Sequence, residues 1–572
     1  MVVKKICKAV FRSLKKIKNI PELPDQIKIS SMWNKRHDFY LPFQAFGCSK
    51  KTYESQIIQL FPKQIKFSIL VPLYNTPENF LKEMIASVLF QTYQNWELCL
   101  ADGSDSNHDY VKKICQEISS KDPRIKYQKL EKNGGISENT NACIKMASGD
   151  YISLFDHDDL LHPCALYETM KAICEKDADF VYTDEVTFYS PKINHIASTN
   201  FKPDFSSDYF LAINYICHFT SFKKEFIDVV GGYDSKTDGA QDFDLFLRIT
   251  EKAKNITHIS KCLYYWRASP TSTASGFGAK TYAQEAGRLA VEKALKRRGI
   301  DAQASTYRQD FVYKTSYTIK DTPKISIIIP NLNNKEIALC IESIIKNTSY
   351  SNYEIIVVDY TKLNKSEGNV QLLPWSNEIN IAAMNNYGAE NASGDYLLFL
   401  ESNTKVISQN WLQELLMFAQ RENTGLVSGK LYYEDGRVYN TGLALGVKGG
   451  FEYLNKGLAN VENGFGFTSV VVHNLSAVSS GCLMTSKKVF EKLKGFTTEL
   501  KNSFYEIDFC IRLRKENLLI VWTPFAELCH LKNHALSKTQ TKKDKKLLLK
   551  KWKDELQKQD PYYNNTKICF PE

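Results

Sequence analysis

The chain has 572 residues, of which 43% are hydrophobic and 24% are charged, the balance of a globular protein with a packed core. Its length exceeds that of one typical domain, so we expect at least two domains. The formal net charge is +10, but the basic residues gather at the two ends and are not interleaved with aromatic residues, which argues against a nucleic-acid-binding protein.

The first predicted unit is an N-terminal extension, residues 1–65, which resembles neither half of the remaining chain. Residues 2–18 place apolar side chains at helical spacing with lysines on the other face, a pattern typical of a helix lying on an anionic membrane surface. Such helices also occur packed against a domain or bound to nothing. No apolar stretch approaches the roughly 20 residues that a membrane span needs, and the sequence shows no secretory signal.

The cysteines indicate the cellular compartment. Fourteen are scattered along the chain without a C-x-x-C pair, which is typical of reduced thiols in a cytosolic protein and not of a disulfide framework. We therefore expect a cytoplasmic protein that is held peripherally at the inner face of the cell membrane by its N-terminal helix.

Two stretches of the chain begin with the same pattern. Residues 66–72 and 324–330 are nearly continuous apolar runs, as expected of strands covered on both faces. Each is followed by an amphipathic helix and by a second apolar strand that ends in an aspartate, Asp102 or Asp359. Strands alternating with helices at this spacing predict an α/β fold with mainly parallel sheets in two tandem domains. The predicted boundaries are 1–65 for the extension, 66–300 for domain 1, 301–322 for a polar linker, 323–540 for domain 2 and 541–572 for a basic C-terminal tail.

One segment occurs twice. The sequence Ala-Ser-Gly-Asp-Tyr, at residues 147–151 and again at 392–396, leads into a short apolar run and then a polar cluster. In an α/β protein this pattern predicts a buried strand that delivers acidic side chains to its C-terminal tip, where open sheets bind ligands. The first tip contains Asp-His-Asp at residues 156–158, whereas the second contains Glu-Ser-Asn at residues 401–403. The chain is therefore predicted to have two related sites, of which only the first keeps both carboxylates.

The carboxylates of the first tip suit a divalent cation. Asp156 and Asp158 flank one residue, so on an extended segment both can turn toward one ion. Hard oxygen ligands favour Mg²⁺ or Mn²⁺ bridging phosphate oxygens. Asp102, at the end of an earlier strand, is suited to accept a hydrogen bond from a base or a ribose. The alternatives are an ordinary surface turn for the D-x-D pair and a helix-capping role for Asp102.

Two predicted helix starts in domain 1 also carry polar residues. Residues 132–139 form a glycine turn that leads into a helix and includes Asn139; glycines allow close backbone approach, and a helix N-terminus favours phosphate. Ser137 is equally suited to a plain N-cap. Residues 239–248 begin an amphipathic helix with acids in its first turn, where Asp242 either offsets the helix dipole or acts as a general base toward an incoming hydroxyl.

These segments belong to a longer ordered series of motifs. The motifs lie at residues 71–77, 91–93, 96–98, 133–137, 156–159, 241–244 and 263–267 in the first half, and at 411–412, 429–431, 480–482, 508–514, 524–527 and 560–564 in the second. In order and residue type, this series resembles family 2 glycosyltransferases over roughly residues 66–565. The resemblance implies two GT-A-type nucleotide-binding domains and inverting sugar transfer.

The resemblance implies a role for each site residue of domain 1. Those implied to bind the nucleotide-sugar are Pro72, Tyr74, Asn75, Asp102, Asn139 and Asp156, with Trp266 and Arg267 near the donor phosphate or the acceptor. Asp156 and Asp158 would ligate Mn²⁺ or Mg²⁺ on the diphosphate, where the ion offsets charge on the leaving group. Asp242 would be the base on the opposite face of the donor, so that one displacement inverts the anomeric carbon. Tandem members often have His where Tyr265 stands, which leaves a third metal or phosphate contact from that position open.

Domain 2 departs from the family pattern. The residues implied for it are Asp359, Glu401 and Asn403 for the nucleotide-sugar, Glu506 for the base and His530 for the metal. Asn403 aligns with Asp158, and a neutral amide binds a divalent cation much less well than a carboxylate. Glu506 aligns with Asp242 and can still act as a base, while a metal role and a structural role for His530 are both open. We expect this half to bind nucleotide or glycan, and leave its transfer activity open.

On this resemblance, the predicted function is a membrane-associated glycosyltransferase that uses UDP- or dTDP-sugars and a glycan or polyprenyl-linked acceptor in surface polysaccharide synthesis. Mn²⁺ or Mg²⁺ is the expected cofactor. One alternative is a bifunctional transferase or polymerase with both domains active. Another is a glycan-binding scaffold with a decayed site in domain 2, and a nucleotide-sugar hydrolase is a minor third.

Overall fold

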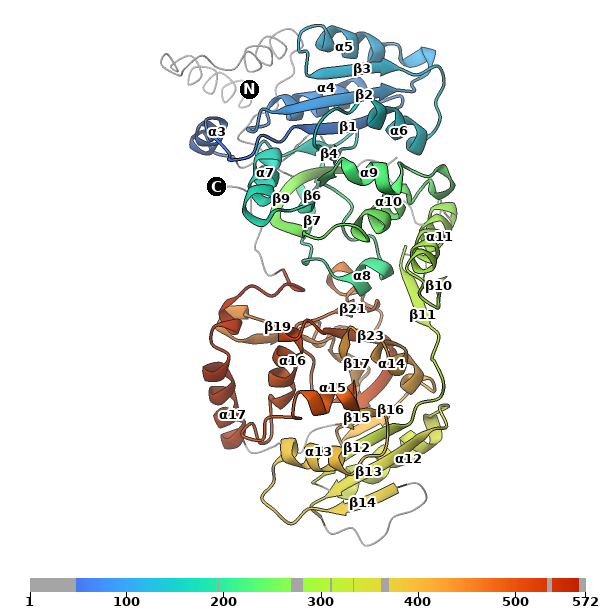
Figure 1. Ribbon diagram of the computed structural model, residues 1–572, viewed down its shortest axis with the longest axis vertical. Helices are drawn as coiled ribbons and strands as arrows, with labels where there is room; N and C mark the ends of the chain where they lie inside the picture. The colour runs from blue at the N-terminus through green and yellow to red at the C-terminus, as the bar shows by residue number, and fades with distance from the viewer. Residues whose placement is uncertain are drawn as a thin grey trace.

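The computed structural model describes residues 48–190, 192–193, 195–268, 281–308, 311–332, 334–361, 370–531 and 538–564. Two α/β domains follow one another along the long axis of the molecule, domain 1 at the blue and green end and domain 2 at the yellow and red end (Figure 1). The amphipathic helix predicted over residues 2–18 lies outside the described residues. Within the described ranges, no helix is both long enough and apolar enough to span a bilayer.

Domain 1 is built on one mixed sheet with the strand order β3-β2-β1-β4-β8-β6-β9-β5, and β7 pairs with β6. The first four strands in this order run parallel, and β8 joins them in the antiparallel sense. The strands are β1 (Phe67–Leu73), β2 (Trp96–Asp102), β3 (Ile125–Lys129), β4 (Tyr151–Leu154), β5 (Leu160–Leu161), β6 (Phe180–Tyr189), β7 (Ile196–Asn200), β8 (Thr220–Lys223) and β9 (Ile256–Ala268). The helices are α3 (Lys50–Ile57), α4 (Glu78–Leu89), α5 (Tyr110–Ser119), α6 (Ile136–Met146), α7 (Ala165–Lys176), α8 (Ser207–Ala212), α9 (Glu225–Val230), α10 (Gln241–Thr250) and α11 (Thr281–Arg297).

Domain 2 repeats this order as β14-β13-β12-β15-β22-β17-β23-β16, with β18 beside β17 and β21 beside β23. The predicted tandem α/β fold is therefore confirmed, with each sheet parallel in its first four strands and mixed beyond them. The strands are β12 (Ile325–Asn331), β13 (Tyr353–Asp359), β14 (Val370–Pro374), β15 (Tyr396–Leu400), β16 (Thr404–Val406), β17 (Thr424–Tyr433), β18 (Val438–Asn440), β19 (Leu443–Leu445), β20 (Phe451–Tyr453), β21 (His473–Asn474), β22 (Cys482–Ser486) and β23 (Leu519–His530). The helices are α12 (Asn334–Asn347), α13 (Ile381–Glu390), α14 (Trp411–Ala419), α15 (Lys487–Lys492), α16 (Tyr505–Lys515) and α17 (Lys538–Lys551).

Burial on both faces explains the apolar runs that open the two domains. All seven residues of β1 are buried. Ile69 and Val71 pack on one face with α4, α5 and α7, while Leu70 packs on the other face with α6 and α10. In β12, Ile327 and Ile328 divide in the same way between two cores. Strands covered on both sides have little room for charged groups along their length, so charged residues collect beyond the strand ends.

The repeated Ala-Ser-Gly-Asp-Tyr segment is a turn that fastens β4 to β1 and β2. The Glu97 carboxylate of β2 accepts hydrogen bonds from the Ser148 N–H at 2.5 Å, the Ser148 hydroxyl at 2.8 Å and the Ser68 hydroxyl at 2.7 Å. The Gly149 N–H donates to Ser68 Oγ at 2.9 Å. The same contacts in domain 2 join Glu354, Ser393, Ser326 and Gly394. The repeat is therefore a structural device present in both domains.

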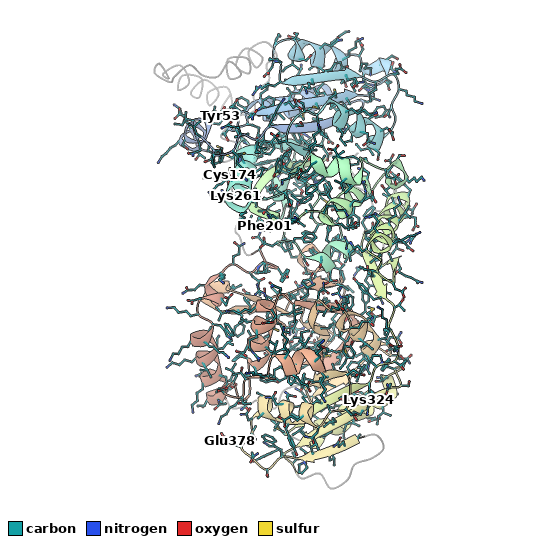
Figure 2. All side chains as sticks on the ribbon, in the orientation of Figure 1. Tyr53, Cys174, Phe201, Lys261, Lys324 and Glu378 are labelled. Carbon is teal, nitrogen blue, oxygen red and sulfur yellow. The ribbon has the colours of Figure 1, made fainter. Side chains whose placement is uncertain are left out.

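A lysine neutralises the glutamate in each of these turns. The Lys66 ammonium lies 2.5 Å from Glu97, and the Lys324 ammonium lies 2.7 Å from Glu354. Figure 2 labels Lys324, which immediately precedes β12, among the side chains at the lower end of domain 2. Burial favours the neutral acid, but Lys324 and the hydroxyl and amide donors outweigh it and lower the pKa of Glu354 to about 2. Both turns therefore keep their glutamate ionised at physiological pH.

The region between the domains and the C-terminal region are both structured. Within the segment expected to be a polar linker, β10 (Ala302–Thr306) pairs antiparallel with β11 (Tyr313–Tyr317). Within the segment expected to be a basic tail, α17 buries Asp544 against domain 2. The chain beyond α17 returns to domain 1, where the Asp204 N–H donates to the Pro561 carbonyl at 2.6 Å.

Alanine at the turn glycines should destabilise both domains. A Cβ at Gly149 would lie 2.5 Å from the Lys66 carbonyl oxygen, and a Cβ at Gly394 would lie 2.7 Å from the Lys324 carbonyl oxygen. Because these oxygens belong to backbone at the start of a paired strand, we expect Gly149→Ala and Gly394→Ala each to lower the free energy of unfolding by about 1–3 kcal/mol. Denaturant unfolding of each variant measures the change. Unfolding midpoints equal to wild type in both variants would show that the turns relax freely.

Candidate functional site

The C-terminal ends of the parallel strands bring the predicted site residues of domain 1 to one edge of its sheet. β1 pairs with β2 so that Leu73 lies opposite Asp102, and with β4 so that Leu70 lies opposite Leu154. The segments that follow these strands therefore meet at the edge where open α/β sheets bind ligands. The predicted residues on these strands and segments are Pro72, Tyr74, Asn75, Asp102, Asp156 and Asp158.

Asp102 is fully buried and organises the loop beside it. Its carboxylate accepts hydrogen bonds from the Ser104 N–H at 2.8 Å and from the Tyr127 hydroxyl at 2.7 Å. The Ser104 hydroxyl in turn accepts a hydrogen bond from the Asn75 N–H at 2.9 Å. Asp102 thus fixes the loop after β1, in which Tyr74 is 47% exposed.

The glycine turn before α6 is held by Asn139, which is buried. The Asn139 carbonyl oxygen accepts from the Gly134 N–H at 3.1 Å, and its amide donates to Asn133 Oδ1 at 2.9 Å. Gly135 has a φ of +89° directly before the helix, a conformation that favours glycine. A Cβ at Gly103 would lie 2.9 Å from the Asn139 amide nitrogen, so this turn packs against the loop that follows β2.

A histidine that the sequence did not identify, His218, lies against Asp156. Its Nε2 is 3.3 Å from Asp156 Oδ2 and its Nδ1 is 3.4 Å from Glu185 Oε2. Its ring stacks on Tyr264 with centroids 4.7 Å apart and lies 5.5 Å from the ring of Trp266. Burial disfavours the imidazolium, but the two carboxylates outweigh it and raise the pKa of His218 well above its usual value. Burial likewise opposes ionisation of Asp156, but the His218 charge and hydrogen bond lower its pKa.

Arg267, predicted to lie near the donor phosphate or the acceptor, is enclosed within the domain. Its side chain has no exposed area, and its guanidinium pairs with Glu83 and donates to the Ser190 hydroxyl at 2.9 Å. Its Nε donates to the Asp158 carbonyl at 2.5 Å, and its backbone N–H donates to Asp159 at 2.7 Å. In this position Arg267 braces the tip that carries Asp158 and presents no guanidinium surface to a ligand.

Tyr265, which stands where tandem family members often have His, faces away from Asp156. Successive residues of a strand point to opposite faces of the sheet. Tyr264 and Trp266 meet His218, whereas Tyr265 packs in a separate apolar cluster and stacks on His162 with centroids 6.3 Å apart. The side chain at position 265 therefore packs on the face of β9 opposite to the one that meets His218.

Asp242 lies in the first turn of α10. Its Oδ2 accepts a hydrogen bond from the Asn214 amide at 2.9 Å, and its Oδ1 accepts from the Phe243 N–H at 2.8 Å. Burial raises the pKa of Asp242, as does the charge of Asp156, while these hydrogen bonds and the charge of His218 offset part of the rise. A raised pKa brings an aspartate closer to the range of a general base.

Asn214 and His218 belong to one segment, residues 213–218, which we call the bridging loop. It joins α8 to β8 and contacts Asp242 through Asn214 and Asp156 through His218. The sequence analysis missed this loop and Glu185. The one available signal was a pair of polar residues, Asn214 and His218, inside the otherwise apolar stretch 209–219.

The tip of domain 1 offers two carboxylates, Asp156 and Asp158, to a divalent cation. Among the described residues, no group of three or more His, Cys, Asp or Glu side chains is arranged to hold a metal ion. Mg²⁺ is, however, commonly bound by one or two carboxylates together with substrate phosphates. Asp156 and Asp158 are both partly exposed at the tip after β4. The donor set therefore suits an ion that binds together with a diphosphate.

At the equivalent tip of domain 2, the polar side chains are hydrogen-bonded to neighbouring residues of the same domain. Glu401 accepts hydrogen bonds from the Ser480 hydroxyl and from His530 Nε2, the latter at 2.9 Å. The Asn403 amide nitrogen lies 3.4 Å from His530 Nε2 and 3.5 Å from the Leu531 carbonyl oxygen, and both Asn403 and His530 are buried. This set fits a divalent cation poorly, because an amide replaces one of the two carboxylates and is itself buried against His530.

Two other predicted residues of domain 2 are buried. Asp359 accepts hydrogen bonds from the Asn331 amide and the Thr361 hydroxyl, each at 2.7 Å. Glu506, in the first turn of α16, is 4% exposed, and its Oε2 has no hydrogen-bond partner within the described part of the chain. Burial, with the charge of Glu401, raises the pKa of Glu506 to about 8. At pH 7 a carboxyl group with this pKa is mostly protonated, and only its smaller ionised fraction can accept a proton.

The two domains bring a histidine to the first acidic residue of the tip from different parts of the fold, the bridging loop in domain 1 and the end of β23 in domain 2. By the register of β16 with β23 and of β5 with β9, the position equivalent to His530 is Trp266. By the register of β15 with β22 and of β4 with β8, the position equivalent to His218 is Gly481. The two tips therefore share a scaffold but not their charge partners.

Both domains match the same family of known proteins. A sequence model described as "Glycosyl transferase family 2" matches residues 68–231 and 326–494, one stretch in each domain. The uncharacterized protein y4gI of Sinorhizobium fredii is 35% identical over 493 residues, which cover 83% of this chain and 54% of that protein. The O-antigen biosynthesis protein RfbC of Myxococcus xanthus is 29% identical over 495 residues, which cover 84% of this chain and 38% of that protein. The chain thus spans about half or less of the length of these relatives.

A solved structure is also similar. The crystal structure of S. aureus TarS residues 1–349 in complex with UDP-GlcNAc matches with 20% sequence identity and a TM-score of 0.34. The match covers 40% of this chain and 67% of that one.

A neutral side chain at position 506 should stabilise the protein at alkaline pH. The Glu506 carboxyl ionises near pH 4.5 when unfolded and near pH 8 when folded. Stability therefore falls as the pH rises from about 4.5 to 8, because only the unfolded state releases the proton in that range. We expect Glu506→Gln to remove this fall and to raise the melting temperature at pH 8 by at least about 2–4 °C. Calorimetry at pH 5 and pH 8 measures it, with Glu422→Gln at an exposed carboxylate as the control; parallel pH curves for Glu506→Gln and wild type would refute the raised pKa.

Proposed function

The chain belongs to glycosyl transferase family 2, and we propose that its domain 1 is an inverting glycosyltransferase of surface polysaccharide synthesis. It moves a sugar from a UDP- or dTDP-sugar to a glycan or polyprenyl-linked acceptor. The observation that carries this proposal is the meeting of Asp102, Asp156, Asp158 and Asp242 around one sheet edge. The name of the Myxococcus relative, an O-antigen biosynthesis protein, supports a surface polysaccharide as the product.

The nucleotide binds over the loops that follow β1 and β2. Asp102 acts here by position, since its carboxylate holds Ser104 and through it the Asn75 loop. Tyr74, exposed on that loop, offers an aromatic face to the base. The glycine turn before α6 packs beside it, and the N–H groups at a helix start favour phosphate.

Asp156 and Asp158 are the residues that would hold Mn²⁺ or Mg²⁺ together with the diphosphate of the donor. When bound, such an ion offsets the negative charge that develops on the leaving nucleoside diphosphate. The protonated His218, held between Asp156 and Glu185, adds a second positive charge at this point. Arg267 keeps the tip in place from inside the domain.

Asp242 accepts the proton of the acceptor hydroxyl. The Asn214 amide and the Phe243 N–H each occupy one of its oxygens, so the carboxylate keeps one orientation while other lone pairs remain available. The acceptor oxygen bonds to the anomeric carbon as the bond from that carbon to the diphosphate oxygen breaks, and the hydroxyl proton passes to Asp242. Attack from the face opposite to the leaving group inverts the configuration.

For domain 2 we propose binding of nucleotide or glycan without independent transfer. Glu401 is held by Ser480 and His530, and Asn403 replaces the second carboxylate. The raised pKa of Glu506 also disfavours a base at that position. These features support a binding domain over the bifunctional alternative, which requires the closed tip to open.

Calorimetric titration with UDP and with dTDP, in the presence and absence of Mn²⁺, tests the roles of the two domains. We expect metal-dependent binding at one site, lost in Asp158→Ala because a single carboxylate holds the ion and diphosphate weakly, and kept in Glu401→Ala. Two sites, each lost in its own variant, would identify a bifunctional enzyme. If neither nucleotide bound to the wild-type protein, the alternative of a glycan-binding scaffold would be favoured.

The same titration on Asp242→Asn separates donor binding from catalysis. An amide keeps the size of the side chain but cannot take up the hydroxyl proton, so transfer should fall about 10²–10⁴-fold while UDP binding is unchanged. Glu506→Gln is the matched control in domain 2 and should keep full transfer. Wild-type transfer by Asp242→Asn would remove Asp242 from the role of base.

We propose further that residues 2–18 hold the protein at the inner face of the cell membrane, close to a polyprenyl-linked acceptor. The support is their amphipathic, lysine-rich sequence. Deleting residues 1–18 should move the protein from the membrane fraction to the supernatant of a cell lysate, with transfer to a water-soluble acceptor unchanged. Unchanged partitioning of the truncated chain would exclude this anchor.

A further inference from the structure

Domain 2 forms an ion pair and hydrogen bonds with α8, the helix that leads into the bridging loop of domain 1. The two terminal nitrogens of Arg421 lie 2.6 and 3.0 Å from the two carboxylate oxygens of Asp208 in α8. The side chain of Asp208 is only 2% exposed, and a bidentate pair of this kind fixes orientation as well as distance. Asn474 of β21 completes the contact, since its amide donates to Asp208 at 2.6 Å and its carbonyl oxygen accepts from the Ser206 hydroxyl at 2.9 Å.

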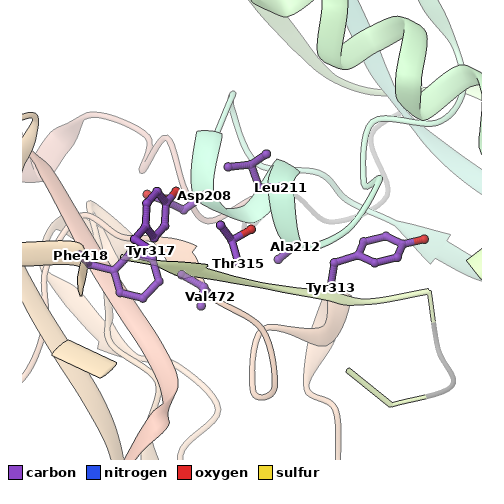
Figure 3. Close-up of a pocket in the computed structure, with 8 residues that line it drawn as sticks. All are labelled: Asp208, Leu211, Ala212, Tyr313, Thr315, Tyr317, Phe418 and Val472. Carbon is purple, nitrogen blue, oxygen red and sulfur yellow. The ribbon is translucent and has the colours of Figure 1, made fainter. Parts of the chain in front are cut away.

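Aromatic side chains enclose this ion pair. Figure 3 shows Asp208 beside Tyr317 and Phe418, at a small cavity between α8 and β11. The Arg421 guanidinium donates to the Tyr317 hydroxyl at 3.1 Å and lies 5.1 and 5.2 Å from the ring centroids of Tyr317 and Phe418. Removing either charge would leave the other buried and unpaired, so this contact holds the two domains in one arrangement.

Direct contacts join α8 to the bridging loop, so the position of the helix determines the position of the loop. α8 is six residues long and ends directly before the loop. The loop folds back on the helix, because Tyr215 stacks on Tyr209 with centroids 4.6 Å apart and the Tyr215 hydroxyl accepts from the Ser206 N–H at 2.9 Å. The Tyr209 hydroxyl donates to the Gly466 carbonyl of domain 2. A shift of α8 therefore moves the bridging loop with it.

We infer that domain 2 positions the active-site loop of domain 1, with Arg421 as a positioning residue. The contacts run from Arg421 through Asp208 and α8 to the loop side chains that hold Asp242 and Asp156. Domain 2 is then required for transfer by domain 1 whether or not it has chemistry of its own. The inference rests on the proposed role of Asp242 as the base.

The acidity of Asp242 reports on the position of the loop. The titratable groups that face Asp242 are His218 and Cys217 from the bridging loop, Asp156 from the tip after β4, Tyr233 from the segment before α10, and Tyr313 from β11. His218 and the Asn214 amide lower a pKa that burial and Asp156 raise. Displacing the loop removes these hydrogen-bond and charge partners and also uncovers the carboxylate, so the pKa of Asp242 changes. Because a base acts in its deprotonated form, the acidic limb of the kcat/KM profile then shifts with it.

Arg421→Lys in the full chain is the first test. Lysine keeps the positive charge beside Asp208 but loses the bidentate geometry. We expect faster amide hydrogen exchange over residues 206–218, a fall in kcat of about 10–100-fold with little change in KM for the nucleotide-sugar, and a shift in the acidic limb of the kcat/KM profile. Arg437→Lys, at an exposed ion pair with Asp435 in the same domain, is the matched control and should change none of these.

The double variant Asp208→Asn/Arg421→Gln separates positioning from folding. It leaves no unpaired buried charge, so the domains should melt as in wild type while exchange, kcat and the pH limb change as in Arg421→Lys. Unchanged exchange and an unshifted limb in both variants would overturn the inference. Faster exchange with unchanged transfer would overturn it as well. If instead Asp242→Asn retained full transfer, the proposed base would fail while the exchange result would still show that domain 2 holds the loop.

Discussion

Coverage of the parallel strands by helices on both sides decides where polar chemistry occurs in this protein. Strands such as β1 and β12 are buried along their whole length, so the acidic residues stand at their carboxyl ends or after them. The two glutamates that lie within the four parallel strands of each sheet, Glu97 and Glu354, are tolerated because each is paired with a lysine and with the N–H of a serine turn. One packing arrangement therefore produces both the repeated structural turn and the clustered tip.

The two domains share one strand arrangement, but their tips carry different charged and polar side chains. In domain 1 the charge partner of the first acid comes from a loop, and Asp158 remains at a partly exposed rim. In domain 2 the partner comes from the end of β23, where His530 closes over both Glu401 and Asn403. The first acid of each tip is paired with a histidine, so the tips differ mainly in the second position, where Asp158 is a partly exposed carboxylate and Asn403 is a buried amide against His530.

The sequence predicted the tandem α/β fold and the strand-tip acids because both follow from local pattern. It missed His218, since the contact of His218 with Asp156 joins a loop and a tip that no spacing rule connects. It could not show that the pleat of β9 turns the Arg267 side chain inward, where its guanidinium pairs with Glu83, because burial depends on residues distant in sequence. The raised pKa of Glu506 was equally invisible, because it arises from burial and a distant charge.

The return of the C-terminal segment to domain 1 sets an order on biosynthesis. The Asn564 amide donates to Asp184 of β6 at 2.9 Å, across 380 residues of chain. A ribosome adds about 5–20 residues per second, so β6 is made roughly 20–80 s before this partner exists. Domain 1 therefore leaves the ribosome with its contacts to the C-terminal segment still unmade, and its native state is complete only after domain 2 has been translated.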